Sequence, residues 1–337
     1  MSRLSEAKAL DLFYNASLAE LREKAHAARS QIIAADSATY LVMRIVSVTN
    51  ICIADCKYCA FYRRPEDKEG YVLSLEQIFE KIDKLLLKGG RLVAMEGGFN
   101  PALGLEHYEN LFAKIRERYG QQIEIYGPTP VEVLFVARNS KVSASETLKR
   151  LWKAGLHWIP GGGAEILTPA WRRKLSPKKY SVEQYLETVE EAQRQGFGTT
   201  ATMVIGFGET FEDRVEHLKK IRDLQDRTKG FASFLCWTYQ TKNTALGGNG
   251  ASKEDYLKTI AVARLYMDNI PHIRTSLLTE KENGARALQF GADDFDIALE
   301  DLVTQQAGVT VEEDIEKVLA WVQNRGIKPV RREPWRV

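Results

Sequence analysis

The sequence lacks several features that would define other classes of protein. It contains no run of about 20 apolar residues, the length that a helix needs to span a bilayer. Its 47 basic and 45 acidic side chains nearly cancel, whereas nucleic-acid-binding proteins usually carry a clear basic excess. Its first residues alternate charged and apolar side chains without the apolar core of a secretory signal. We therefore expect a cytoplasmic protein that acts on a small molecule, with neither a membrane nor a nucleic acid as partner.

Cysteine is also scarce, but its distribution is uneven. The 337 residues include 4 cysteines, and three of them, Cys52, Cys56 and Cys59, fall within one short segment. Disulfides are rare in the reducing cytoplasm, so clustered cysteines there more often bind metal or carry redox chemistry. We expect the fourth, Cys236, to behave as a small buried apolar residue.

The hydrophobic residues suit a sizeable core, and their pattern indicates the fold. Short apolar runs alternate with amphipathic stretches, which predicts βαβ units and a parallel sheet. Six or seven such units over roughly 250 residues predict a (β/α) barrel, complete or partial, with a doubly wound sheet as the alternative. The expected strands are 41–48, 91–96, 122–126, 156–159, 199–205, 231–237 and 273–277, and the expected helices are 75–88, 104–118, 144–154, 181–195, 210–228, 252–268 and 279–289.

The ends of the chain read as extensions of this barrel. Residues 4–36 predict two short helices, with Asn15 and Ser17 as candidate N-caps of the second. No repeat, low-complexity tract or linker rich in glycine and serine divides the chain. We therefore predict a single domain over residues 1–337, with short helical N-terminal and C-terminal extensions.

The cysteine segment follows the first expected strand, at the end of the barrel where barrel enzymes place their active sites. Three thiolates can bind three irons of a four-iron cluster and leave the fourth iron open to a ligand. Structural zinc is the alternative, but it would normally require a fourth Cys or His. His26 and Cys236 both lie outside this loop. A three-ligand cluster is therefore the leading hypothesis.

The spacing Cys-x3-Cys-x2-Cys, with an aromatic residue before the last cysteine, resembles the signature of radical S-adenosylmethionine (SAM) enzymes. The resemblance implies a [4Fe-4S] cluster and SAM, whose reductive cleavage gives a 5′-deoxyadenosyl radical. Residues 95–98 resemble the segment whose backbone holds the methionyl amine. Residues 202–209 resemble the G-x-I-x-G-x-x-E element near adenine, from which Thr202 and Val204 depart. The cofactor-binding residues predicted on this basis are Tyr58, Glu96, Gly97, Gly98, Glu165, Gly206 and Glu209, where Glu165 suits ribose hydroxyls.

Four further segments, 61–65, 160–165, 200–203 and 237–240, are similar to the dehypoxanthine futalosine cyclase family of menaquinone biosynthesis. That resemblance implies that the adenosyl radical takes the ribose C4′ hydrogen and that the carbon radical then adds to the benzoate ring. Residues 127–132 and 291–296 differ from the family pattern. Aminofutalosine synthases and deazaflavin (FO) synthase subunits share the cysteine loop and stay as alternatives. An iron–sulfur carrier or a zinc protein is the non-enzyme alternative.

This chemistry requires an anion site, a base and a reductant. A guanidinium can hold the benzoate carboxylate with two hydrogen bonds, which makes arginines candidates. Restoring the aromatic ring requires a base within hydrogen-bond reach of the ring proton. A flavodoxin or ferredoxin would suit as electron donor. The candidates are Arg63, Arg64, Arg172 and Arg173 for the carboxylate, Trp237 and Tyr239 for stacking, and Glu132 or His157 for the base.

Overall fold

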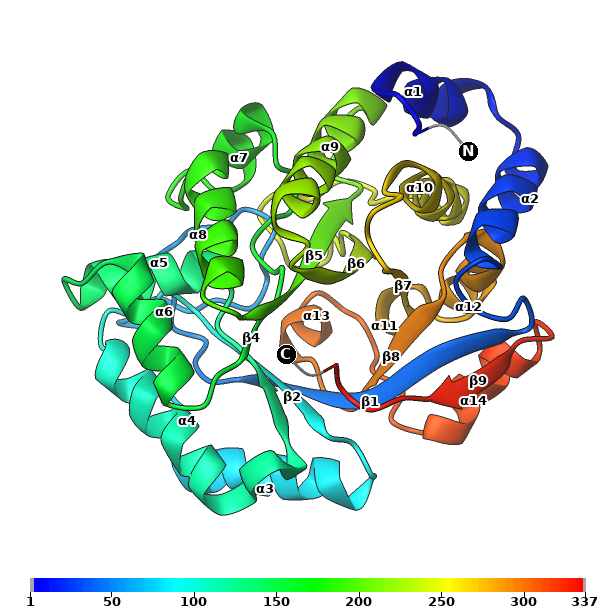
Figure 1. The fold of residues 1–337 in the computed structure, drawn as a ribbon. Coiled ribbons are helices and arrows are strands. Elements are labelled where there is room, and N and C mark those ends of the chain that lie inside the picture. The colour runs from blue at the N-terminus through cyan, green and yellow to red at the C-terminus, as the bar shows by residue number, and fades with distance from the viewer. Residues whose placement is uncertain (1–2, 336–337) are drawn as a thin grey trace.

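The computed structural model describes residues 3–335. Strands β1 to β8 are all parallel, each pairs with the next, and β8 pairs with β1, so the sheet closes into a barrel. Figure 1 shows the ring of strands with helices around it. The predicted (β/α) barrel is therefore confirmed as a complete one, and the doubly wound alternative is wrong. The strands are β1 (Ser37–Ser47), β2 (Leu92–Glu96), β3 (Glu124–Tyr126), β4 (Trp158–Ile159), β5 (Gly198–Ile205), β6 (Phe231–Thr238), β7 (His272–Ser276), β8 (Asp294–Ala298) and β9 (Lys328–Arg331).

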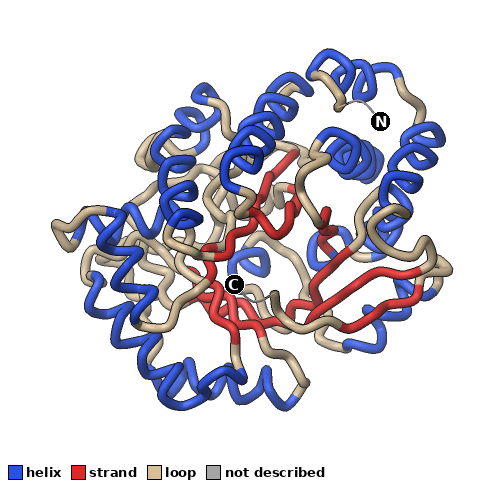
Figure 2. Tube along the Cα trace, viewed as in Figure 1, coloured by secondary structure: helices blue, strands red, loops and turns tan. Residues whose placement is uncertain are grey.

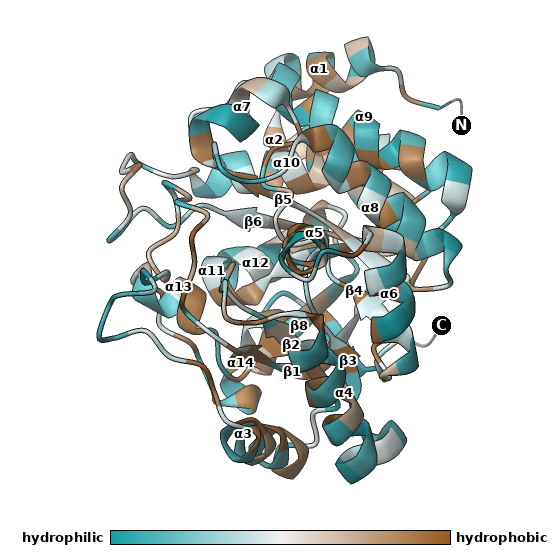
Figure 3. Cartoon of the chain, turned by 90° about the vertical axis from the view of Figure 1, so that its left-hand side faces the viewer, coloured by the Kyte–Doolittle hydropathy of each residue, from teal (hydrophilic) through white to brown (hydrophobic). Residues whose placement is uncertain are grey.

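Helices fill the connections between these strands and form the outer layer (Figure 2). In Figure 3 the surrounding helices carry both brown and teal stretches, as expected of amphipathic helices with one face on the barrel. No helix in the described part of the chain is long and apolar enough to cross a membrane. The helices are α1 (Glu6–Asn15), α2 (Leu18–Arg29), α3 (Leu75–Leu87), α4 (Leu105–Tyr119), η1 (Gly120–Gln122), α5 (Pro130–Asn139), α6 (Ala144–Lys153), α7 (Pro169–Leu175), α8 (Val182–Arg194), α9 (Phe211–Thr228), α10 (Lys253–Tyr266), α11 (Leu277–Glu280), α12 (Glu282–Ala287), η2 (Leu288–Phe290), α13 (Leu302–Gln306) and α14 (Ile315–Gln323).

The apolar run of β1 is buried on both faces. Leu41, Met43 and Ile45 belong to the cluster inside the barrel. Val42 and Val46 point the opposite way and pack in the core between the barrel and its helices. Side chains alternate along a strand, and a parallel strand covered on both sides therefore reads as a continuous apolar run. This pattern made β1 easy to predict.

Some elements differ from the expectations. Strand β8 was missed because its inward-facing Asp296 and its neighbour Asp294 interrupt the apolar pattern. The expected helix 279–289 is divided into α11, α12 and η2, and Lys281 at the first break has a φ of +51°. Asn15 ends α1 instead of capping α2. Ser17 is the N-cap, and its hydroxyl accepts a hydrogen bond from the Glu20 N–H.

The C-terminal segment covers the N-terminal mouth of the barrel. Residues 37–40 of β1 pair with β9, whereas residues 43–47 pair with β2 farther along the same edge. After β9 the chain turns over the middle of the barrel (Figure 1, red), and Trp335 stacks on His272 with ring centroids 5.4 Å apart. Trp335 also packs near Trp158, with ring centroids 6.4 Å apart. Both partners start barrel strands, so this end is covered and the site lies at the other end.

Candidate active site at the carboxyl ends of the strands

The cysteine loop follows β1 and is held by backbone hydrogen bonds. The Cys52 N–H donates to the Arg63 carbonyl and the Arg63 N–H donates to the Asn50 carbonyl, both at 2.8 Å. The Cys52 sulfur accepts the Phe99 N–H at 3.2 Å, which ties the loop to the segment after β2. Asp55 turns the loop with a φ of +56°. Contacts between protein groups therefore hold the loop in this conformation without a cofactor.

The three thiols of this loop form a donor set that fits an iron–sulfur cluster. Burial raises the pKa of the Cys59 thiol to about 11 and also raises the pKa of Cys52. Cluster binding must therefore displace protons from the thiols, and N–H groups directed at sulfur help to stabilise the thiolates. Cys236 cannot join them, because its neighbours Leu235 and Trp237 face the barrel cavity and its own side chain is fully buried on the opposite face. In residues 3–335 no group of three or more His, Cys, Asp or Glu side chains is arranged to hold a single metal ion.

Gly97 and Gly98 let the end of β2 approach the cysteine loop closely. A Cβ atom at Gly98 would lie 2.1 Å from the Ile51 carbonyl oxygen and 2.6 Å from the Cys52 Cβ. The Glu132 carboxylate accepts the Gly97 N–H at 2.8 Å and, with its other oxygen, the Thr129 N–H at 2.8 Å. Both Glu132 oxygens are thus engaged in holding the backbone. Glu132 positions the Gly97 segment and does not face the cavity.

This close approach makes Gly98→Ala a sensitive test of the loop. The added methyl group would collide with backbone, which cannot rotate away. We expect a loss of about 1–3 kcal/mol in the free energy of unfolding, as for other overpacked sites. We also expect reduced iron content after anaerobic reconstitution. Gly104→Ala is the control, because its Cβ would meet only the Ser140 hydroxyl at 3.2 Å. Equal iron content and stability in the two variants would contradict the role assigned to Gly98.

A buried charged network lies beside the cysteine loop. The Tyr58 hydroxyl donates to Glu165 at 2.5 Å, and Lys179 Nζ lies 2.7 Å from that hydroxyl and 3.3 Å from the Glu165 carboxylate. Arg172 Nη1 donates to the other Glu165 oxygen at 2.9 Å. Burial alone would raise the Glu165 pKa, but Lys179 and Arg172 outweigh it and hold that pKa below its ordinary value. Glu165 is therefore a fixed anion between two cations, and its backbone adopts a φ of +46°.

The loop after β5 is braced in a similar way. Glu209 accepts the N–H groups of Gly206 and Phe207 at 2.9 and 2.8 Å, and Arg214 Nε donates to it at 2.9 Å. Gly206 has a φ of +101°, and a Cβ there would lie 2.4 Å from the Ala251 nitrogen. These contacts shape the loop at the barrel's rim. The Glu209 carboxylate is thus occupied by hydrogen bonds from protein groups.

His217 on α9 supports the segment after β4. Its Nδ1 accepts the Leu167 N–H at 3.0 Å, two residues past Glu165. Burial lowers the His217 pKa to about 3, so the folded protein keeps this imidazole neutral.

A pH-dependent stability follows from that neutral imidazole. Below about pH 6.5 the unfolded chain binds a proton at His217 that the folded chain does not bind until about pH 3. The contribution of His217 is therefore fully present above about pH 6.5. It is lost as the pH falls, by up to about 1.4 kcal/mol per unit. The free energy of unfolding can be measured by chemical denaturation at several pH values between 4.5 and 7.5. We expect it to increase more steeply with pH in the wild type than in His217→Asn. Parallel slopes would contradict this prediction.

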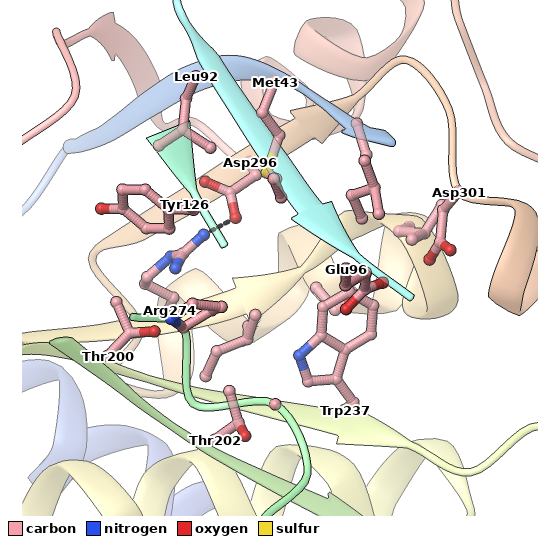
Figure 4. Close-up of a pocket in the computed structure, with 18 of the residues that line it drawn as sticks. Met43, Leu92, Glu96, Tyr126, Thr200, Thr202, Trp237, Arg274, Asp296 and Asp301 are labelled. Atoms are coloured by element: carbon pink, nitrogen blue, oxygen red, sulfur yellow. Dashed lines mark ion pairs between the residues drawn. The ribbon is translucent and has the colours of Figure 1, made fainter. Parts of the chain in front are cut away.

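The barrel encloses a cavity of about 290 Å³, shown in Figure 4. Glu96, Asp301 and Trp237 lie together at one end, towards the carboxyl ends of the strands. Arg274 and Asp296 form an ion pair deeper inside, next to Tyr126. The other lining side chains include Leu41, Met43, Ile45, Leu92, Thr200, Thr202, Val204, Leu235, Leu278 and Glu165.

Several side chains predicted for the site lie outside this cavity. His157 packs on Trp152, with ring centroids 4.6 Å apart, and is not among the lining residues. Arg63 Nε pairs with Glu69 at 2.7 Å. Arg64 pairs with Asp55, and Arg173 is exposed on α7. Tyr239 lines a separate polar groove. The positions of His157, Arg63 and Tyr239 therefore do not support the roles predicted for them.

Four polar side chains of the site were not singled out from the sequence: Lys179, Arg274, Asp296 and Asp301. Arg274 stood within the expected strand 273–277, where a central charge was the available signal. Asp296 ended the stretch 291–296 that differs from the family pattern. Lys179 and Asp301 follow loops of ordinary composition. The closed barrel brings Arg274, Asp296 and Asp301 to one cavity, and Lys179 contacts Glu165, which lines the same cavity.

Comparison with known proteins agrees with this geometry. The model of the Radical SAM superfamily matches residues 46–221, which include the cysteine loop, the Gly97 segment and Glu209. The chain therefore belongs to the radical SAM superfamily. Residues 228–335 match the model described as the CofH/MqnC C-terminal region. Within the superfamily the chain is thus similar to the CofH/MqnC group.

Individual relatives support the same grouping. The chain is 40% identical over 297 residues to the cyclic dehypoxanthine futalosine synthase of Halalkalibacterium halodurans, covering 87% of this chain and 80% of the relative. It is 39% identical to the enzyme of the same name from Streptomyces coelicolor, covering 98% and 84%. Among solved structures, methylornithine synthase (PylB) superposes with a TM-score of 0.77 at 21% identity, covering 98% of this chain and 95% of that one. This last likeness concerns the fold alone.

Proposed function

We propose that this protein is a radical SAM cyclase that converts dehypoxanthine futalosine to cyclic dehypoxanthine futalosine in menaquinone biosynthesis. The observation that carries the proposal is the similarity to cyclic dehypoxanthine futalosine synthases across most of both chains. The cavity inside the barrel supports it, because the barrel wall limits the contact of a bound radical with solvent. When bound, the [4Fe-4S] cluster and SAM supply the adenosyl radical that takes the ribose C4′ hydrogen.

The chain's own residues would hold these two groups. Cys52, Cys56 and Cys59 would bind three irons of the cluster, and the fit of the three thiols supports this assignment. The backbone at Gly97 and Gly98, which Glu132 positions, suits the methionyl amine. The buried Lys179 and Arg172 offer positive charge to the methionyl carboxylate, because Arg172 Nε and Nη2 have no hydrogen-bond partner among the described residues. The rim residues Tyr58, Glu165, Gly206 and Glu209 would shape the nucleoside end.

The substrate would lie deeper in the cavity. Arg274 is the arginine that β7 directs into the barrel, and it is only 7% exposed. Asp296 Oδ1 is buried without a hydrogen-bond partner in the described structure, which often indicates a missing ligand, whereas Arg274 Nε lies 3.5 Å from the Asp294 carboxylate. We assign the benzoate carboxylate to Arg274 and a substrate hydroxyl to Asp296. Trp237 offers a flat face for the ring.

Two further features belong to this proposal. The radical reaction requires one-electron reduction, for which a flavodoxin or ferredoxin is the expected partner. All four cysteines are free thiols, which suits a reducing compartment, so a cytoplasmic location is proposed.

An anaerobic product assay tests the function. The reconstituted enzyme, SAM, a reductant and dehypoxanthine futalosine should give free 5′-deoxyadenosine and the cyclic product in equal amounts. An aminofutalosine synthase would instead build the adenosyl group into its product. No new product from dehypoxanthine futalosine would reject the cyclase assignment, and zinc without iron would reject the radical chemistry.

A further inference from the structure

Cyclisation leaves a chemical step for which no base has been placed. After the C4′ radical adds to the benzoate ring, the cyclised radical must lose the ring hydrogen to become aromatic again. The two electrons of the broken C–H bond stay in the ring, one proton leaves, and one electron leaves. A base must therefore lie within hydrogen-bond reach of the ring proton. Of the bases predicted from the sequence, Glu132 is engaged with backbone and His157 lies outside the cavity.

The cavity offers four carboxyl groups, and three of them are already engaged. Glu165 is bound by Tyr58, Lys179 and Arg172. Asp296 pairs with Arg274. Asp301 caps α13 and accepts the Val303 and Thr304 N–H groups. Among the lining residues that the structure describes, none is a histidine.

Glu96 is the fourth, and its surroundings differ. It is the last residue of β2 and lines the cavity, and no hydrogen bond or ion pair to its carboxyl group is found in the described part of the chain. Figure 4 shows its carboxyl group at the same end of the cavity as the Trp237 indole, where a substrate ring could stack. The next two residues are Gly97 and Gly98, which pack against the cysteine loop. Glu96 thus lines the cavity near Trp237 and is two residues from Gly98, which packs against Cys52.

We propose that Glu96 is the base that removes the ring proton when aromaticity is restored. The proton would go to the Glu96 carboxylate, and the oxidised [4Fe-4S] cluster that Cys52, Cys56 and Cys59 would hold could accept the released electron, so the step would balance in atoms and electrons. This inference rests on the proposed cyclase function. It gives the side chain of Glu96 a role in the substrate reaction, while the backbone that follows serves the cofactor.

The electrostatics of the cavity suit a base that works near neutral pH. Burial, together with the carboxyl groups of Asp301 and Glu132, raises the pKa of Glu96 to about 8, although the Lys179 ammonium lowers it. A carboxylate with a raised pKa accepts a proton more readily than an ordinary one. Above about pH 8 the base form predominates, so the yield of cyclic product per 5′-deoxyadenosine should increase with pH in the wild type.

The test compares reconstituted wild type, Glu96→Gln and Glu96→Asp, with Glu106→Gln on the exposed surface of α4 as the control. Each holoenzyme is assayed anaerobically with dehypoxanthine futalosine, SAM and dithionite, and both products are quantified. We expect Glu96→Gln to form 5′-deoxyadenosine at a rate within about threefold of the wild type and to lose the cyclic product by about 100-fold or more, the size of a general-base contribution. Glu96→Asp should recover part of the product, and Glu106→Gln should match the wild type.

Three results would overturn the inference. An unchanged ratio of cyclic product to 5′-deoxyadenosine in Glu96→Gln shows that another group takes the proton. Loss of both products, together with loss of the SAM-induced change in the cluster's electron paramagnetic resonance spectrum, places Glu96 in cofactor binding instead. If the wild type itself forms no cyclic product, the proposed function fails and this inference fails with it. The first two outcomes leave the cyclase function intact.

Discussion

Cys56→Ala should abolish both cluster assembly and 5′-deoxyadenosine formation. Cys56 is 6% exposed and lies between Cys52 and Cys59 in the loop. Removing one of three thiols leaves two ligands for a four-iron cluster that otherwise usually has four cysteine ligands. We expect iron and sulfide to fall to background and turnover to fall by more than about 1,000-fold, because no radical can form without the cluster. Metal analysis, visible absorbance and the 5′-deoxyadenosine assay would measure these effects.

Cys236→Ala provides the matched control for this variant. Cys236 is a fully buried cysteine on β6, and its side chain faces away from the cavity. We expect a modest loss of stability from the small void and normal iron content. Retained SAM cleavage in Cys56→Ala, or equal loss of iron in both variants, would show that the loop cysteines do not bind the cluster. The two variants thereby separate ligand loss from general damage to the fold.

The barrel could be predicted from the sequence largely because parallel strands are buried on both faces. The runs that became β1, β5 and β6 are apolar enough to be recognised without an alignment. Strand β8 was missed because its buried aspartates are stabilised by Arg274 and Arg332, which are distant in sequence. β9 is short and largely exposed, so it carries little hydrophobic signal. The single-domain organisation stays a prediction.

Some residues of the site could also be located from the sequence, and others could not. Residues contiguous in sequence, such as the cysteine loop and Gly97–Gly98, carry a local signature and could be located directly. Arg274 and Asp296 come from separate strands and meet only when the barrel closes, and Lys179 pairs with Glu165 from the segment before α8. Side-chain direction could not be derived from the sequence, which predicted Glu132 as a candidate base and Glu96 as a cofactor-binding residue. In the structure one binds backbone N–H groups and the other faces the cavity.

Arg274→Gln should reduce kcat/KM for dehypoxanthine futalosine by about 100-fold or more, mainly through an increased KM. Truncating one partner of a buried, hydrogen-bonded charge pair costs about 2–5 kcal/mol, much of it from the charge left behind. In Arg274→Gln, both the Asp296 carboxylate and the benzoate carboxylate of the substrate would lose their positive partner. Steady-state kinetics with saturating SAM would measure the change.

The stranded Asp296 charge can be separated from the loss of substrate binding by a second variant. Arg274→Gln/Asp296→Asn removes both members of this ion pair, while the buried Asp294, which lies 3.5 Å from Arg274 Nε, keeps its ion pair with Arg332. If the pair only stabilises the barrel, the double variant should recover both stability and KM. If Arg274 holds the carboxylate, stability should recover while KM stays high. A substrate analogue with a carboxamide in place of the carboxylate sharpens the test, because the wild type should discriminate strongly against it and Arg274→Gln should not. Equal discrimination by the two enzymes would assign the carboxylate to another group in the cavity.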